Sequence, residues 1–274
     1  MASESPLVGR PVNIGDVQVT PVSDGFLRFR PTDFFPRSSA DTWEVEAHRA
    51  WLDGDGMLVL PMASFVIRAP GTTLLVDCGL NQDDGDDWRG GRLPDALSVA
   101  GLTRDEIDVV VFTHLHVDHV GWATDAGSPF FPRATYRCHG ADWEWSATAQ
   151  SGLHGARLAG LAERLDPIGD GERLAPGVTA VATPGHTPGH IAVVVSGPGE
   201  RAFLLGDVAH CPVQLTPGDW KTWGDVDPVG AARTRDRLLR EIEGDDIVAS
   251  AHFPELHFGR LVSAGEGRTW VPLS

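Results

Sequence analysis

The amino-acid sequence predicts an α/β fold built as one unit of two similar halves. Short apolar runs of strand length alternate with stretches of helical pattern, and this alternation occurs twice along the chain. No low-complexity segment or domain linker separates the two halves. A chain of 274 residues can bury a substantial core. We therefore expect a single domain over residues 1–274.

Residues 1–56 are expected to extend this unit at its N-terminal side. Val12–Val22 alternates apolar and polar residues around a Gly-Asp pair, which is typical of a hairpin at a sheet edge. From Gly25 to Gly56 the pattern breaks down into a long loop rich in Phe and Trp. Such a loop must place its rings on the core or over the mouth of a pocket. We therefore expect Phe34 and Phe35 to line a substrate pocket.

A second hairpin is predicted over Met57–Ala69 and Thr72–Asp77, because Pro-Gly separates two apolar runs. Their near-continuous apolar character indicates strands that are buried on both faces. Leu93–Leu102 has a helical pattern with a proline in its first turn, and a capping-box sequence after it adds one further turn. Ile107–Phe112 then follows as a short buried strand.

The second half is predicted to open with helices over Ala141–Ala149 and His154–Leu165. Buried strands are predicted over Val178–Thr183, Ile191–Val195, Ala202–Leu205 and Ile247–Ala251. Before the last of them, Asp227 as N-cap and Pro228 at the first helical position begin a final helix, which Gly244 follows.

The composition argues against several classes of partner. The formal net charge of −16 repels phosphate backbones, so we expect no nucleic-acid partner. No apolar run reaches the length of about 18 residues that a membrane span needs. Residues 1–10 lack the pattern of a secretory leader, so we expect no membrane partner and a cytoplasmic location. The three cysteines lack metal-ligand spacing and are expected to be buried free thiols.

The stretch Thr113–His119 carries the strongest chemical signal. It places three of the 11 histidines and an aspartate directly after a predicted strand, where open α/β sheets bind ligands. His114 and His116 are two positions apart, so both rings can face one cation when the backbone is extended. Asp118 and His119 then turn toward a second position. The stretch predicts half of a metal site.

Other predicted strands also end in residues of the metal-ligand type. His186 and His190 lie in a loop after one strand, where two prolines stiffen the chain and two glycines free it. Asp207 follows a second strand, and His252 follows a third. A metal ion bound by histidine needs three or four imidazole or carboxylate ligands in all, and these strand ends can supply the ones that are missing.

With these residues in place, the chain resembles the metallo-β-lactamase superfamily. Residues 114–119 match its HxHxDH signature, His186 its GHTPGH loop, Asp207 its bridging aspartate and His252 its last histidine. The resemblance covers about Met57–Arg260. It implies a four-layer αβ/βα sandwich, here with an aromatic-rich N-terminal extension, and two divalent metal ions between the sheets. Zn²⁺ is the expected metal.

The resemblance also implies a division of the ligands. His114, His116 and His186 would hold the first metal, Asp118, His119 and His252 the second, and Asp207 would bridge both. Two such ions lower the pKa of a shared water toward about 7, supply hydroxide and polarise the substrate oxygen that develops charge.

Further residues are expected to support this chemistry. Asp118 lies beside the nucleophile and is expected to return a proton to the leaving group. Asp77 resembles the family carboxylate that orients a ligand imidazole, and His190 is expected to make a turn or supporting hydrogen bond instead of binding metal. His210, three residues beyond Asp207, is a second catalytic candidate, with simple packing as the alternative. Related lactonases carry a tyrosine near that point, which Tyr136 does not replace.

Two more residues are expected in the substrate pocket. Trp122 follows the HxHxDH motif immediately after Gly121, so it is well placed to form a wall of the site. His257 lies close to the last predicted ligand, His252. The aromatic N-terminal segment would suit a pocket, and it would equally suit the interface of a homodimer.

The superfamily hosts several chemistries, so the fold alone does not define the reaction. An intact His116 disfavours the flavodiiron proteins, the few residues after His252 disfavour glyoxalase II, and the charge disfavours RNA processing. The hydrolase branch of acyl-homoserine lactonases and methyl parathion hydrolase-like enzymes remains, and the phrases LLGDVAHCPVQ and AHFPELHFGRLV resemble the latter more closely. The expected function is binuclear-metal-dependent hydrolysis of a small neutral ester or lactone. A phosphotriester (organophosphate) hydrolase, a mononuclear-iron persulfide dioxygenase-like enzyme and a non-catalytic metal-binding interaction protein are the alternatives.

Overall fold

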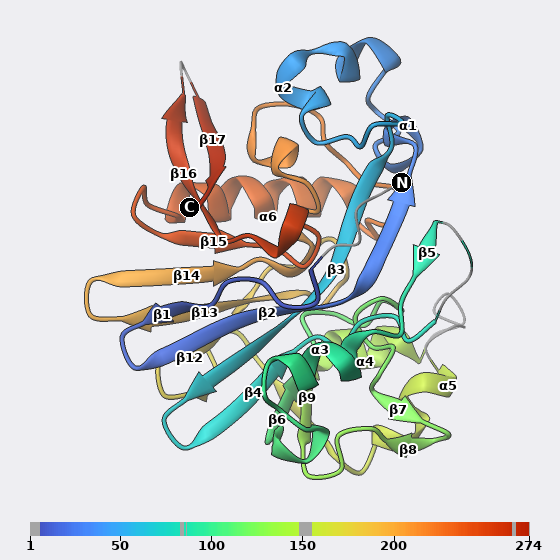
Figure 1. Cartoon of the computed structure of the whole chain (residues 1–274), viewed down its shortest axis with the longest axis vertical. Helices are drawn as coiled ribbons and strands as arrows, with labels where there is room; N and C mark the ends of the chain where they lie inside the picture. Colours follow the sequence, from blue (N-terminus) through green and yellow to red (C-terminus); the bar gives the residue numbers. More distant parts are fainter. Residues whose placement is uncertain (1–5, 83–84, 86, 148–154, 265–266, 274) are drawn as a thin grey trace.

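The computed structural model describes residues 6–82, 85, 87–147, 155–264 and 267–273, and two large sheets dominate it (Figure 1). The first sheet has the spatial order β1 (Val12–Ile14), β2 (Val17–Phe29), β3 (Leu58–Ala69), β4 (Thr72–Val76), β6 (Val109–Val111), β9 (Thr135–His139) and β10 (Leu165–Ile168), with β5 (Trp88–Arg89) paired to β2. The second has the order β11 (Arg173–Ala175), β12 (Val178–Ala182), β13 (Ile191–Gly197), β14 (Glu200–Leu204), β15 (Ile247–Ala249), β16 (Gly259–Ala264) and β17 (Gly267–Pro272).

Helices cover the outer faces of both sheets (Figure 1). The longest, α6 (Pro228–Glu241), lies outside the second sheet, and α3 (Leu93–Val99) and α4 (Gly140–Ser146) lie outside the first. The remaining short elements are α1 (Pro31–Phe34), η1 (Ala40–Glu44), α2 (Glu46–Arg49), η2 (Arg104–Glu106), the β7 (Thr124–Asp125) and β8 (Ser128–Pro129) pair, α5 (Gly155–Leu158), η4 (Ala159–Leu161), η5 (Gly206–Val208), η6 (Pro212–Leu215) and η7 (Pro254–Leu256).

Alternation along the central strands divides the core into layers. In β13, Val193 faces the cluster between the two sheets, whereas its neighbour Val194 packs with Leu238 of α6. In β4, Leu74 faces the same central cluster, and Leu75 packs with the residues of α3. Strands buried on both faces need apolar residues at successive positions, as these have. The predicted four-layer αβ/βα sandwich is confirmed.

Most predicted elements are present with small shifts of their ends. The first hairpin turns at Gly15 and Asp16, and the second joins β3 to β4. Asp227 caps α6 by accepting a hydrogen bond from Gly230 N at 2.9 Å, as its position predicted. All three cysteines are buried and free, as expected.

The predicted loop over Gly25–Gly56 is wrong at its start, because β2 continues to Phe29. Gly25 forms part of a bulge in β2, with φ of 148°, and a side chain there would meet Arg89 O at 1.7 Å. Glycine at this position lets β5 approach β2, and it does not end the strand. The rest of that segment contains α1, η1 and α2.

The strands of the described residues that were not predicted are β5, β7, β8, β9, β10, β11, β16 and β17. The second predicted helix of the C-terminal half is wrong at Leu165, where β10 begins. The predicted helix ends at Ala149 and His154 lie outside the described residues. Within the described part of the chain, no helix is long and apolar enough to cross a membrane.

Candidate metal centre and its pocket

The predicted ligand residues meet at one edge of the two sheets. The loop after β6 carries His114 and His116, and the loop after β12 carries His186. Asp207 follows β14, and His252 follows β15. These loops converge because β4 and β6 run parallel in one sheet, as do β14 and β15 in the other, so their carboxyl ends share an edge.

Among the described residues, the side chains form three groups, in each of which the ligand atoms lie within 4.8 Å of one another. One of them, Asp207, His210 and His252, shares residues with the other two. Of those two, the first group is His114, His116, His186 and Asp207, and the second is Asp118, His119 and His252. Asp207 lies between them: its Oδ2 is 3.2 Å from His186 Nε2, and its Oδ1 is 3.2 Å from His252 Nε2 and 3.3 Å from His119 Nε2. One carboxylate oxygen thus faces each group.

Hydrogen bonds on the outer side of the rings define which nitrogen faces the centre. The Thr113 hydroxyl donates to Asp77 Oδ2 at 2.8 Å, so His114 Nδ1, at 3.0 Å from that hydroxyl, must be the donor to it. His119 Nδ1 donates to the same Asp77 oxygen at 2.8 Å. When these two rings are neutral, Nε2 carries the lone pair that a metal needs. The predicted orienting contact of Asp77 is therefore present.

The rings of His252 and His186 are held in the same way. His252 Nδ1 donates to the Pro61 carbonyl at 2.7 Å, and His186 Nδ1 donates to Asp225 Oδ1 at 2.9 Å. His190 differs, because Asp207 N donates to its Nε2 at 2.9 Å and its Nδ1 lies 2.7 Å from Thr183 Oγ1. Burial and the charge of His186 hold the pKa of His190 well below its ordinary value. Both nitrogens of His190 are engaged, and it belongs to neither group.

The donor set fits divalent cations. His116 Nδ1 lies 2.9 Å from both His114 Nε2 and His186 Nε2, so three imidazole nitrogens converge on one point. Nitrogen atoms at such distances need a cation among them, which is either a proton or a metal ion. His119 Nε2 and Asp207 Oδ1 are buried without a hydrogen-bond partner. Imidazole nitrogen and carboxylate oxygen are the ligands that zinc and similar ions prefer.

The electrostatics of the centre also favour positive charge. Burial alone would raise the pKa of Asp207, but the surrounding histidines, with His119 the strongest, hold it well below its usual range. Burial alone would lower the pKa of His186, but hydrogen bonds to Asp207 and Asp225 outweigh it and raise that pKa to about 9. Burial and the charge of His119 keep the pKa of His114 well below its ordinary value. The centre therefore combines an ionised carboxylate with at least one uncharged imidazole.

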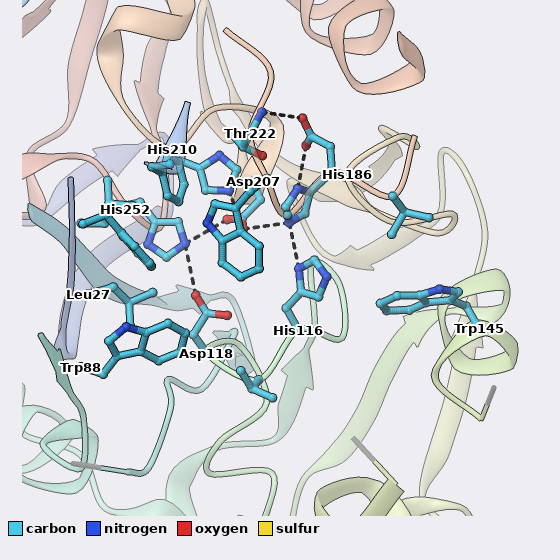
Figure 2. A pocket seen from close by; sticks show the side chains of 18 residues that line it. Leu27, Trp88, His116, Asp118, Trp145, His186, Asp207, His210, Thr222 and His252 are labelled. Atoms are coloured by element: carbon cyan, nitrogen blue, oxygen red, sulfur yellow. Dashed lines mark hydrogen bonds and ion pairs between the residues drawn. The ribbon is translucent and has the colours of Figure 1, made fainter. Parts of the chain in front are cut away.

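The centre forms the floor of a cavity of about 530 Å³. Figure 2 shows Trp88 and Trp145 at opposite sides of the histidines and aspartates. The aromatic lining residues are Phe29, Phe34, Trp88, Trp145 and Trp223, and among the described residues neither lysine nor arginine lines the cavity. The cavity is therefore apolar and aromatic at its walls and acidic at its floor.

Asp118 and His210, the two predicted catalytic residues, both line this cavity. Asp118 Oδ2 lies 3.5 Å from His252 Nε2, and its side chain is 13% exposed. His210 Nε2 lies 3.0 Å from Asp207 Oδ2, and the His210 ring stacks on that of His252 at 5.3 Å. Phe34 packs edge-on against His210 and lines the cavity as expected.

The other expected pocket residues lie elsewhere. Phe35 is fully buried behind Phe34, where it packs against tryptophan rings. Trp122 packs on Phe130, and its Nε1 donates to the buried Asp24 at 2.8 Å. His257 lines a separate cavity, because the positive φ angles of the two residues before it turn the chain away from His252.

Sequence reasoning missed several residues of the site. Asp225 orients His186 and accepts a second hydrogen bond from Thr222 N at 3.0 Å. Trp88, Trp145 and Trp223 were not singled out among the nine tryptophans. No local pattern marks Asp225 as part of the site, because its contact with His186 spans 39 positions of the chain.

Comparison with known proteins places the fold and the centre in a family. Residues 59–252 match the model of the metallo-beta-lactamase superfamily. That match spans most of the chain, and the protein therefore belongs to this superfamily, as its motifs predicted.

Individual relatives are more distant. The chain is 27% identical over 177 residues to N-acyl homoserine lactonase AttM of Rhizobium radiobacter, covering 53% of this chain and 64% of that protein. It is 29% identical over 190 residues to metallo-beta-lactamase domain-containing protein 1 of Homo sapiens, covering 67% and 61%. The chain thus spans a little under two thirds of the length of these curated relatives.

Two solved structures share the whole fold. AidC, described as a dizinc quorum-quenching lactonase in complex with a product, superposes with a TM-score of 0.86 at 21% identity, covering 98% of both chains. The hydrolase AbOPH of the beta lactamase superfamily superposes with a TM-score of 0.86 at 23% identity, covering 96% of this chain and 97% of that one. At these identities the likeness establishes the fold.

Proposed function

We propose that this protein is a metal-dependent hydrolase of small, neutral esters or lactones. The observation that carries this proposal is the position of Asp207, with one carboxylate oxygen toward each of two histidine-containing groups at the floor of an aromatic cavity. The lactonase names of AttM and AidC support the same class of reaction.

The proposed ligand set follows the two groups of side chains. His114, His116 and His186 would hold one divalent ion, Asp118, His119 and His252 a second, and Asp207 both, with Zn²⁺ as the expected metal. Such ions, when bound, acidify water toward a pKa of about 7 and polarise a substrate oxygen.

The chain's own residues contribute proton transfer and orientation. Asp118 is partly exposed to the cavity, so it can hold a proton and deliver it to the leaving alkoxide. His210 lies in the cavity wall between Phe34 and His252, where its ring can orient the substrate oxygen. Asp77 and Asp225 keep His119 and His186 in the tautomer that presents Nε2.

The cavity walls support this substrate class. Aromatic side chains favour apolar groups on either side of the scissile bond, and the described lining contains no lysine or arginine to pair with a charged substituent. A neutral ester or lactone therefore suits these walls better than a charged one. An uncharged phosphotriester meets the same requirement and is the second candidate.

The test compares hydrolysis of p-nitrophenyl acetate, a homoserine lactone and paraoxon, with and without a chelator. We expect the lactone or the carboxylic ester to react fastest, and the chelator to abolish turnover. Paraoxon as the best substrate would favour phosphotriester hydrolysis. The proposal would be contradicted if activity persisted in the presence of the chelator, or if the metal-replete protein hydrolysed none of the three compounds.

A pair of variants separates the centre from the rest of the surface. Asp207→Ala should lose bound metal as well as activity, because both groups share this carboxylate. His257→Ala is the matched control, since His257 lines a different cavity and should retain both properties. Full metal occupancy in Asp207→Ala would refute the bridging assignment.

A further inference from the structure

Asp142 is a buried carboxylate on α4 that has no part in the proposed chemistry. Its side chain has no exposure to solvent, and burial raises the pKa of its carboxyl group, although the hydrogen bonds that it accepts oppose this shift. A buried carboxylate costs free energy unless its hydrogen bonds compensate. Where those hydrogen bonds go therefore indicates what Asp142 does.

All of its hydrogen bonds join uncharged groups on the two loops that carry the first group of ligands. Asp142 Oδ2 accepts from Leu115 N at 3.1 Å and from Thr187 Oγ1 at 2.8 Å. Asp142 Oδ1 accepts from Gly189 N at 2.6 Å. Leu115 lies between His114 and His116 in the sequence, and Thr187 directly follows His186.

These two loops belong to different sheets. Residues 113–119 follow β6 of the first sheet, and residues 183–190 join β12 to β13 of the second. His116 Nδ1 and His186 Nε2 come from opposite loops, yet they lie only 2.9 Å apart. The first group therefore forms only when the two loops are held in a fixed position relative to each other.

The second group is held by other contacts. Asp77 orients His119, and the Pro61 carbonyl orients His252. The hydrogen bonds of Asp142 go to neighbours of His114, His116 and His186, and not to neighbours of the second group.

The glycine at position 189 is a second sign that this contact is tight. A side chain on Gly189 would meet Asp142 N at 2.6 Å, His139 Nδ1 at 2.9 Å and Asp142 Oδ1 at 3.0 Å. The backbone of the second loop thus lies directly on the start of α4, at a distance that only glycine permits.

We propose that Asp142 is a positioning residue that fixes the two loops to each other and thereby sets the metal affinity of the His114, His116 and His186 group. It leaves the affinity of the Asp118, His119 and His252 group unchanged. This inference rests on the proposed metal-dependent function. Its physical reason is preorganisation, because ligands that must first be brought together bind a metal more weakly.

The test uses Asp142→Asn, which keeps the size of the side chain. An amide has one acceptor oxygen, so its NH₂ group must face the N–H of either Leu115 or Gly189, and one hydrogen bond is replaced by a contact between donors. Metal-free wild-type and variant proteins are titrated with Zn²⁺ in competition with a chromophoric chelator. Wild type should bind in two steps. In the variant, one step should weaken by about 10- to 100-fold and the other should stay as in wild type.

Further variants separate positioning from general loss of stability. Asp246→Asn is the matched control, because Asp246 is also a buried carboxylate but binds Arg201 and Glu243 N away from the centre. It should lower stability and leave both steps unchanged. Thr187→Val removes only one of the three hydrogen bonds and should weaken the same step to a smaller extent, which provides a milder probe if Asp142→Asn does not fold.

The outcomes distinguish this inference from the proposed function. Equal weakening of both steps, or two unchanged steps in Asp142→Asn and Thr187→Val, would overturn the role of Asp142 and leave the metal centre intact. Wild-type protein that binds no ion would overturn the proposed function and this inference with it.

Discussion

At the scale of single residues, the two nitrogens of a histidine ring in the centre have different roles. One nitrogen of His119, His186 or His252 faces the other ligands, and the opposite nitrogen is held by a carboxylate or a carbonyl. Sequence predicted the inward-facing residues because they follow strand ends in a recognisable spacing. It predicted Asp77 but not Asp225, because the contact of Asp225 with His186 depends on how a distant loop folds.

Asp225 therefore gives a direct test at this scale. Asp225→Ala removes the acceptor of His186 Nδ1–H, so the ring loses both its orientation and its preferred tautomer. We expect metal affinity and kcat/KM to fall by about 10- to 100-fold with the fold retained. Chelator competition and steady-state kinetics measure these changes. Asp219→Ala is a suitable control, because Asp219 is exposed and pairs only with Lys221 in the described structure. Wild-type affinity in Asp225→Ala would contradict the orienting role.

At the scale of elements, the sequence predicted strands wherever both faces are apolar. Leu74 and Leu75 of β4 face different cores, and so do Val193 and Val194 of β13. By contrast, β9 was missed because polar and charged residues interrupt it, as in the stretch around Arg137, whose guanidinium pairs with Asp166. Strand identity there comes from pairing with β6 and β10, which no local pattern reveals.

The walls of the cavity were unpredictable for a similar reason. Trp223 lies in a loop whose position is fixed from α6, where Arg235 Nη2 donates to Trp220 O at 3.4 Å. Gln214 Nε2 donates to the same carbonyl at 3.0 Å. These contacts join residues that are separated in sequence, so the sequence gives no local sign that Trp223 reaches the cavity.

Gly25 tests the interpretation of β2 and β5. In Gly25→Ala the new Cβ would lie 1.7 Å from Arg89 O, and the backbone has φ of 148°. We expect a loss of at least about 2 kcal/mol in the free energy of unfolding. A higher KM should accompany it, because Trp88 lies on β5 and lines the cavity. Denaturant unfolding and kinetics measure both effects.

The control for that variant is Gly71→Ala. Gly71 also has a positive φ, of 81°, but a side chain there meets nothing within 4 Å. It should cost only the backbone strain of about 1 kcal/mol and leave KM unchanged. Equal losses of stability in the two variants would argue against a steric role for Gly25.

At the scale of the whole molecule, the charge and the cavity both favour the neutral substrates of the proposed reaction. The net charge of −16 and a lining without lysine or arginine both disfavour anions. The four-layer fold places both ligand groups at one edge of the sheets, and the N-terminal segment adds Phe29 and Phe34 to the walls of that site.

This selection predicts a salt-dependent preference. A neutral p-nitrophenyl ester should have a higher kcat/KM than an ester of similar size that carries a carboxylate. Salt screens the repulsion between the surface and the anionic ester. The ratio of kcat/KM for the neutral ester to kcat/KM for the anionic ester should therefore fall between low ionic strength and about 0.5 M salt. The ratio of kcat/KM values at the two salt concentrations checks this. A higher kcat/KM for the anionic ester would contradict the predicted preference for neutral substrates.

The central claim is that the two groups of side chains bind metal ions which hydrolysis requires. Elemental analysis of the purified protein, with hydrolysis assayed on the same samples before metal removal, after it and after restoration with Zn²⁺, tests that claim most directly. The account predicts about two divalent ions per chain, loss of turnover when they are removed and recovery as they return. Turnover that persists in metal-free protein, or a chain that binds no ion at all, would contradict it.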